Sequence, residues 1–164
     1  MRTKHIVIPV AAGIAATLAA VVLATPATGV VGTVMARAGF IDPVDIKLKV
    51  GDQQKEVIHV PHAGDTVMQR IVFAPGGQSG WHSHPGPAIV LVARGELTLY
   101  SSDDPSCVGR HIGLGQGFVD EGQGHVHLAR NLSGQETEVW VTYLDVPPGG
   151  GPRLDAADPG FCPF

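Results

Sequence analysis

The sequence has little charge, few aromatic residues and only two cysteines among its 164 residues. Its formal net charge is −4 and no basic stripe is present, which argues against nucleic acid as a partner. No helical period, heptad or fixed repeat is present past residue 40. Long helices, coiled coils and repeat arrays are therefore not predicted for most of the chain.

The chain does have an uncharged apolar run over residues 6–23, preceded by a short basic stretch. This order is typical of a secretory signal peptide, with small residues that offer cleavage after Ala27 or after Ala38. The run is also just long enough for an uncleaved membrane anchor, and a buried helix is a third reading. We expect residues 1–38 to be a signal peptide or an N-terminal membrane anchor. The rest would be exported, to the cell envelope or outside the cell, and only this segment would contact the membrane.

The two cysteines, Cys107 and Cys162, both lie in the part that we expect to be exported. An even pair in an oxidising compartment predicts a disulfide, which would close a long loop. Two unpaired thiols are the alternative.

Beyond residue 40 the sequence alternates strand-sized apolar runs with glycine- and proline-rich breaks. Runs of this kind cover residues 66–74, 88–100, 125–131 and 137–146. Short strands with such punctuation predict an all-β sandwich or small barrel. We place this domain at residues 39–146. The proline- and glycine-rich residues 147–164 are predicted to be a tail that crosses the surface without forming a strand.

Two histidine pairs, each with one residue between its members, stand out in the predicted domain. They are His82 with His84, and His125 with His127. Alternate residues of a strand point to the same face, so two such pairs on facing strands can converge inside a barrel. Neutral imidazole is a common metal ligand, so the two pairs favour a metal-binding site. Histidines on ordinary surface strands are the alternative.

The first pair lies in a stretch that resembles the first motif of the cupin superfamily. The motif has a glycine, five residues, His-x-His, three or four residues, a glutamate, six residues and a glycine. Gly76, His82, His84 and Gly95 match it in identity and spacing, but Ala88 stands at the position of the glutamate. The resemblance is specific in spacing and departs from the family at one ligand position.

The second cupin motif ends in proline, one residue, glycine, two residues, histidine, three residues and asparagine. Gly124, His127 and Asn131 match these positions, whereas Gly122 stands where the family usually has proline. The two motifs together cover roughly residues 66–145. The resemblance implies a double-stranded β-helix, or jelly-roll barrel, with a metal ion in its mouth.

Carried over by position, the resemblance implies that His82, His84 and His127 are the metal ligands. Because Ala88 cannot coordinate a metal, three alternatives stay open. The site has three histidines and open positions, or His125 is a fourth ligand, or the metal has been lost. The expected cofactor is one divalent ion, and Fe(II), Zn(II), Mn(II), Ni(II) and Cu(II) are not distinguished.

Several further residues near the motifs have predicted roles. Trp81, Ala88 and Phe118 are expected to line a pocket, although aromatic side chains there can equally be core residues. Asp120 and Glu121 are interpreted as turn residues, with an acid or base role as the alternative. The arginines of the expected exported part are scattered along the sequence, so no charged substrate clamp is indicated.

These observations predict an exported cupin-domain protein that binds a divalent metal through three histidines and receives a small-molecule ligand or substrate. A metal-dependent oxygenase or isomerase is one function of such a site. The alternatives are a binding barrel without turnover and a barrel that has lost its metal, because one fold supports many functions. The resemblance also implies a homodimer.

Overall fold

The computed structural model describes residues 24–51 and 56–164, and the regular structure in these residues is entirely β-strand. The strands are β1 (Thr28–Ala38), β2 (Ile46–Val50), β3 (Glu56–Val60), β4 (Asp65–Gln78), β5 (His82–Ser83), β6 (Ala88–Arg94), β7 (Glu96–Ser101), β8 (Arg110–Gly113), β9 (Gly117–Asp120), β10 (His127–Arg130), β11 (Thr137–Val146) and β12 (Leu154–Asp155). The all-β prediction is confirmed. These residues contain no helix that could cross a membrane. The predicted apolar segment over residues 6–23 lies outside the described residues.

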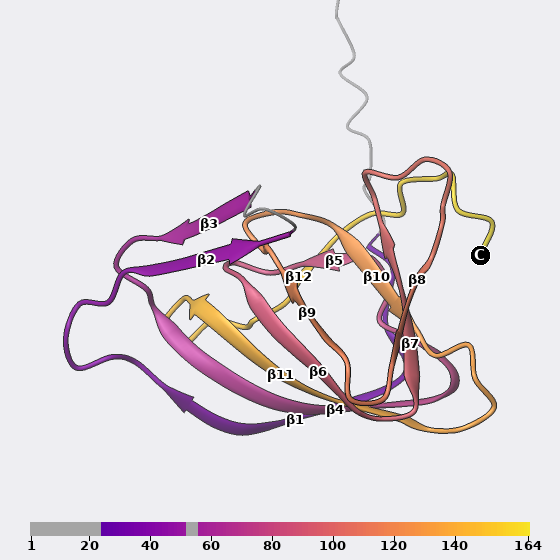
Figure 1. The fold of residues 1–164 in the computed structure, drawn as a ribbon, viewed down its shortest axis with the longest axis horizontal. Helices are drawn as coiled ribbons and strands as arrows, with labels where there is room; N and C mark the ends of the chain where they lie inside the picture. Colours follow the sequence, from indigo (N-terminus) through magenta and orange to yellow (C-terminus); the bar gives the residue numbers. More distant parts are fainter. Residues whose placement is uncertain (1–23, 52–55) are drawn as a thin grey trace, which may run out of the picture.

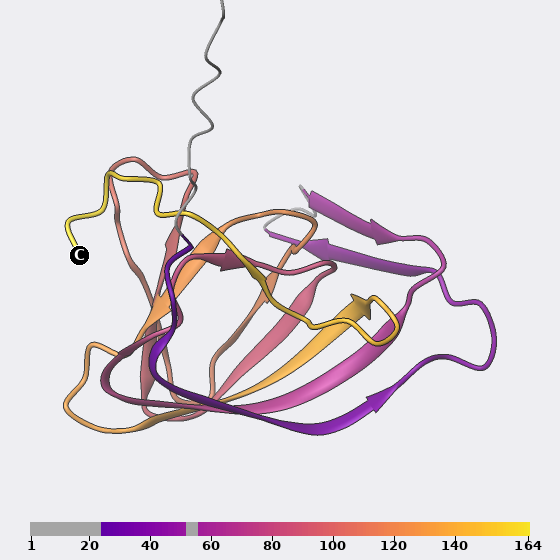
Figure 2. The same cartoon turned by 180° about the vertical axis from the view of Figure 1, so that it is seen from behind.

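Ten strands form one antiparallel sheet that folds over itself into a nearly closed barrel (Figure 1). One layer has the order β1-β4-β11-β6-β9, and the other has the order β12-β5-β10-β7-β8. The layers are joined where Gln78, at the end of β4, pairs with Arg130 on β10. The remaining strands, β2 and β3, pair with each other beside the barrel, as Figure 2 shows from behind.

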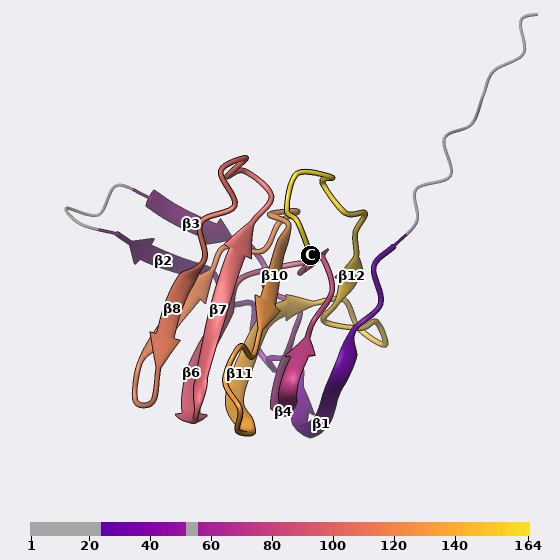
Figure 3. The same ribbon diagram turned by 90° about the vertical axis from the view of Figure 1, so that its right-hand side faces the viewer.

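The barrel interior is filled from alternate positions of its long strands. In β11, Val139 and Val141 are buried, and in β6 the same holds for Val90 and Val92. Each such side chain stabilises the fold by about 1.5–3 kcal/mol when fully buried. The alternation places one face of each strand toward a common apolar core, and Figure 3 shows the strands curving around it.

The turn between β6 and β7 depends on Gly95. Its φ is +72°, a conformation that other residues adopt rarely, and an added Cβ atom would lie 2.6 Å from Oγ1 of Thr137. The apolar run over residues 88–100 therefore forms two strands, β6 and β7, that are separated at Gly95.

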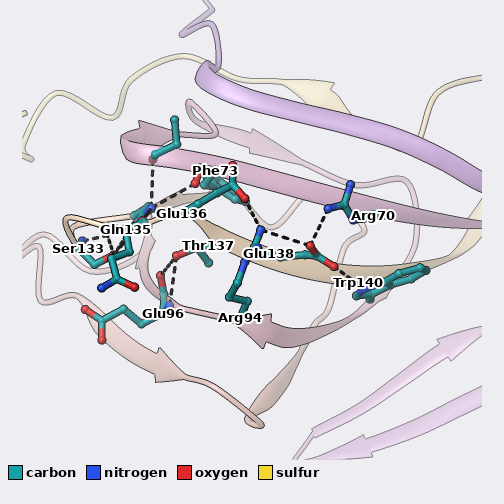
Figure 4. A network of polar contacts seen from close by, with 12 residues as sticks. Arg70, Phe73, Arg94, Glu96, Ser133, Gln135, Glu136, Thr137, Glu138 and Trp140 are labelled. Atoms are coloured by element: carbon teal, nitrogen blue, oxygen red, sulfur yellow. Dashed lines mark hydrogen bonds and ion pairs between the residues drawn. The ribbon is translucent and has the colours of Figure 1, made fainter.

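The outer face of the first layer has a group of ion pairs, shown in Figure 4. Glu138 lies between the core residues Thr137 and Val139 and so points away from the interior. Arg70 on β4 donates to it over 2.7 Å, and Arg94 on β6 lies 3.5 Å from it and also pairs with Glu136. We call Arg70, Arg94, Glu136 and Glu138 the outer-face ion network.

A second, smaller core lies under the C-terminal segment. Trp81, Tyr100 and Leu128 are buried there, and the disulfide between Cys107 and Cys162 packs against them. The predicted pairing of the two cysteines is thus present in the structure. It ties the end of the chain to the loop between β7 and β8.

The structure differs from the sequence analysis at both ends of the barrel. Residues 28–38, assigned there to the N-terminal segment, form β1 and pair along their length with β4. Residues 147–164, predicted to be free of strands, contribute β12, whose Leu154 pairs with Ser83 on β5. Because β12 is a two-residue edge strand, it fits between the prolines and glycines on either side of it.

Candidate metal centre

Three histidines from two strands meet inside the barrel. His127 on β10 is paired with His82 on β5, and His84 follows β5 directly. Their ring centroids are separated by 4.4 Å for His82 and His127, 4.9 Å for His82 and His84, and 5.2 Å for His84 and His127. All three side chains are buried. We call them the three-histidine cluster.

The protonation pattern of the cluster suits a metal ion. Nδ1 of His82 lies 2.9 Å from the carbonyl oxygen of Gly80, and Nδ1 of His84 lies 2.7 Å from that of Pro152. A carbonyl oxygen only accepts hydrogen bonds, so each Nδ1 carries the proton and each Nε2 keeps its lone pair. Carbonyl contacts of this kind orient metal-ligating histidines in known sites.

The spacing of the cluster also fits one ion. One candidate ligand atom from each histidine lies within 4.8 Å of the others. Nitrogen atoms bound to one ion at about 2.1 Å lie at most about 4.2 Å apart. Small ring rotations would therefore bring the three nitrogen atoms to coordination distance, and the residues present could hold a divalent ion.

Burial keeps the first two histidines neutral. It lowers the pKa of His82 to about 2, with help from the nearby rings of His127 and His84 and from Arg153. Burial likewise lowers the pKa of His84 to about 4, with His127 adding to the effect. A neutral imidazole is the form that binds metal, so at neutral pH no proton competes for these two ligands.

Asp120 lies behind the cluster and contacts two histidines. Oδ2 of Asp120 accepts a hydrogen bond from Nδ1 of His125 over 3.1 Å. The same oxygen lies 3.0 Å from Nδ1 of His127, but these two atoms are not aligned for a hydrogen bond. Burial alone would raise the pKa of Asp120, but its contacts with His125 and His127 outweigh this and hold the pKa below its ordinary value. Asp120 is therefore a buried carboxylate that can orient His127.

His125 is not part of the three-histidine cluster, although its ring stacks against that of His127 with the centroids 5.9 Å apart. Its Nε2 is 3.1 Å from Oγ of Ser101, and the hydrogen bond with Asp120 raises its pKa. Asp120, His125 and His127 also lie close enough together to hold an ion as a second group, but here the carboxylate already bonds one imidazole. The rule that alternate strand residues point to one face does not apply to His125 and His127. Gly124 has φ +98°, and β10 begins only at His127, so His125 lies outside the strand.

Two side chains flank position 88, where the family motif has glutamate. Ala88 is fully buried and is paired with Tyr143 on β11 and with Asp120 on β9. Directly paired residues of neighbouring strands point to the same face. The ring of Tyr143 lies 4.9 Å from that of His84, and burial raises the pKa of its phenol. The space beside Ala88 thus has a neutral phenol on one side and a carboxylate on the other.

A cavity of about 270 Å³ opens next to the cluster. All three histidines line it, together with Tyr143 and Arg153 at the polar part. Most of the remaining lining residues are apolar, as in many small-molecule sites.

The residues predicted to line a pocket have different positions. Phe118 lines the cavity, whereas Trp81 is in the second core beside the disulfide. Ala88 is buried in the main core and is not among the lining residues. Trp81 follows Gly80, whose φ is +67°, and its backbone N–H donates to Oγ1 of Thr25. This anchors the residue next to His82 without turning its side chain to the cavity.

Three residues near the cluster have roles that the sequence analysis did not identify: Asp120, Tyr143 and Arg153. Tyr143 continues the buried alternation of Val139 and Val141, so its inward direction could have been found from the pattern. Arg153 lies in the Pro/Gly-rich C-terminal segment and had no such signal. Asp120 was interpreted as a turn residue, and its Oδ1 does accept a hydrogen bond from the N–H of Gly122.

No protein-family model and no curated protein matches the sequence. Among solved structures, the chain is similar to a cupin domain from Bordetella pertussis Tohama I, with 21% identity over 73% of this chain and 95% of that one and a TM-score of 0.45. It is also similar to the Cupin_2 domain of an XRE family transcriptional regulator from Enterobacter cloacae, with 19% identity, 73% and 99% coverage and a TM-score of 0.45.

A third similar structure is an oxalate oxidase, at 30% identity and a TM-score of 0.42. That match covers 49% of this chain and 41% of the oxidase chain. In this barrel, His82 on β5 and His127 on β10 meet beside the cavity.

Proposed function

We propose that this cupin binds one divalent metal ion through His82, His84 and His127 and acts on a small molecule in the adjacent cavity. The observation that carries the proposal is the convergence of three buried imidazoles, two of which have Nδ1 committed to backbone carbonyls. A metal-dependent oxygenase or isomerase is the activity that this site supports best. A bound ion would supply Lewis-acid polarisation or an oxygen-binding position.

The chain's own residues have separate tasks in this proposal. The carbonyls of Gly80 and Pro152 orient the rings of His82 and His84, and Asp120 lies against His127. The apolar wall of the cavity excludes water from the part of the site away from the histidines. The phenol of Tyr143 stays protonated at neutral pH and can donate a hydrogen bond into the cavity.

Metal content is the direct test. We expect untagged protein to contain about one divalent ion per chain by elemental analysis, and His84→Ala to lose it. His111→Ala is the matched control, because His111 is an exposed histidine that pairs with Glu96 over 2.9 Å outside the cavity. Metal retained by His84→Ala, or lost equally from the control, would contradict the ligand assignment.

Turnover separates an enzyme from a binding barrel. Oxygen uptake, or isomer formation followed by NMR, is measured with a panel of small molecules on the metal-loaded protein. Metal binding and ligand binding without turnover would favour the non-catalytic barrel.

We further propose that the barrel is exported. The disulfide between Cys107 and Cys162 supports an oxidising destination. Of the two cleavage positions, the one after Ala27 keeps β1, whereas cleavage after Ala38 would remove all of β1 from its pairing with β4. Cleavage after Ala27 would still remove the bridge of Ala24 to Ala157 and the contact of Thr25 with Trp81. Mass spectrometry of the secreted chain should give a mature N-terminus at Thr28. Homodimerisation stays a prediction that sedimentation would test.

A further inference from the structure

The C-terminal segment brings one arginine to the cavity. Arg153 lines the same cavity as the three-histidine cluster. Its Nε donates to Oδ1 of Asp155 over 2.5 Å, but its Nη2 is buried and has no hydrogen-bond partner among the residues that the structure describes. A buried donor of a charged group is costly to leave without an acceptor. Arg153 therefore lines the cavity with a guanidinium group of which one nitrogen, Nη2, is satisfied by no described residue.

The charge around the cavity favours an anion. Arg153 is the only Lys, Arg, Asp or Glu side chain among the described lining residues of the cavity. A divalent ion on the histidines would add further positive charge to the same space. A guanidinium group presents a planar pair of donors that matches a carboxylate.

Most of the rest of the cavity wall is apolar, with Gln69, Ser79 and Tyr143 as polar exceptions. Val90, Leu99, Phe118, Val139 and Val141 line it, and the volume is only about 270 Å³. A ligand that fills this space has an apolar body, because a second charged group against these side chains would have no partner. The cavity is at the small end of ligand sites, so the body is compact.

The position of the arginine is held from several sides. Leu154 and Asp155 pair with β5, and the N–H of Ala156 donates to the carbonyl of Trp81 over 3.0 Å. The disulfide at Cys162 closes the same segment onto the barrel. Arg153 is thus set in place before any ligand binds, which lowers the entropy cost of binding.

We propose that the cavity takes a small monocarboxylate with an apolar body, and that Arg153 is the residue that selects the carboxylate. This inference deepens the proposed function and rests on the part of it that places a small molecule in the cavity, where the carboxylate end would lie beside the three-histidine cluster. It excludes a compact dianion as the preferred ligand.

Binding of matched acid and amide pairs tests the inference. Isothermal titration calorimetry is run with 3-phenylpropionate against 3-phenylpropionamide, octanoate against octanamide, and oxalate. Both zinc-loaded and chelator-treated protein are used. We expect at least one acid to bind the zinc-loaded protein about 10- to 100-fold more tightly than its amide, as one charge-assisted hydrogen-bond pair implies. Oxalate should bind less tightly than that acid.

Two substitutions and a control assign the preference to Arg153. Arg153→Gln should remove most of the difference between acid and amide while leaving the amide affinity unchanged. Arg153→Lys should keep part of it, because a lysine retains the charge but not the planar pair of donors. Arg94→Gln, which removes a positive charge outside the cavity, should change neither affinity.

The outcomes separate this inference from the proposed function. Three results would overturn the inference even if zinc binds. They are an acid preference that persists in Arg153→Gln, no binding of either acid, and oxalate that binds more tightly than both acids. An acid preference that is present in chelator-treated protein and depends on Arg153 would uphold it, even if no variant ever binds metal and the proposed function fails.

Discussion

The three-histidine cluster and the outer-face ion network are both polar groups on one barrel, yet their surroundings differ in kind. In the network, two arginines and two glutamates pair with each other, and Arg94 and Glu136 are about half exposed. In the cluster, all three imidazoles are buried, and His82 and His84 have Nδ1 bonded to backbone carbonyls, which leaves a lone pair on each Nε2. The network is complete without a ligand, whereas the cluster has unused lone pairs next to a cavity.

This difference bears on how a functional site is recognised. Charges that neutralise each other near solvent contribute little to stability and have no capacity left for a ligand. Buried groups with shifted pKa values and unused donors or acceptors retain that capacity.

Removal of the disulfide should cause the largest loss. The double substitution Cys107→Ser and Cys162→Ser opens a loop whose ends are 55 residues apart, for which the chain-entropy model gives about 4 kcal/mol. Chemical denaturation should show this loss. The same variant should also bind metal less tightly, because the C-terminal segment carries the Pro152 carbonyl that orients His84. Unchanged metal affinity would mean that β12 alone holds the segment.

The stability of metal-free protein should fall as the pH is lowered from 6.5. The folded pKa values of His82 and His84 are lowered to about 2 and about 4, so the unfolded chain binds more protons than the folded one in this range. Stability from these groups is present above pH 6.5 and is lost as the pH falls toward 4. The slope is at most about 2.7 kcal/mol per pH unit for two groups.

His125 contributes to stability in a different pH range. Its pKa is raised, so its contribution is present below its ordinary pKa and is lost as the pH rises through the higher folded value. Denaturation curves between pH 4.5 and 6.5 therefore report mainly on the cluster. His82→Gln should reduce the slope there, and an unchanged slope would contradict the predicted neutrality of the buried ring.

Asp120→Asn should weaken metal binding about 10- to 100-fold, the usual cost of altering a group that orients a metal ligand. The amide keeps the size of the side chain but removes the charge that lies against His127. Competition with a zinc-binding dye gives the affinity. Asp103→Asn is the control, because Asp103 is exposed and lies 3.7 Å from His125 rather than against a cluster residue.

Arg94→Gln should have the smallest effect, with a loss of less than about 1 kcal/mol in unfolding free energy and no change in metal content. Both partners of its closest ion pair are near half exposure. A larger loss would mean that the outer-face ion network is more than a set of surface pairs, and the contrast with the cluster would then be weaker.

Much of the barrel could be predicted because the relevant signals are local. The alternation in residues 137–146 is the strand β11, and Gly95 marks the break between β6 and β7. Asn131, which matches the family motif, bonds the carbonyls of Phe73, Ala74 and Gln135, a set of backbone contacts that fixes a turn. Local rules failed at His125, where a left-handed Gly124 interrupts the strand geometry.

The amino-acid sequence by itself determined the all-β class, the cysteine pair and the three histidines that match the motifs, because period, spacing and residue type are properties of neighbouring residues. Only the tertiary structure decided the role of Asp120, the direction of His125 and the arrival of Arg153 at the cavity. These depend on contacts between distant segments, such as the one between His84 and Pro152, 68 residues apart. Contacts of that kind form only when the sheet has folded over itself and the C-terminal segment has been tied down.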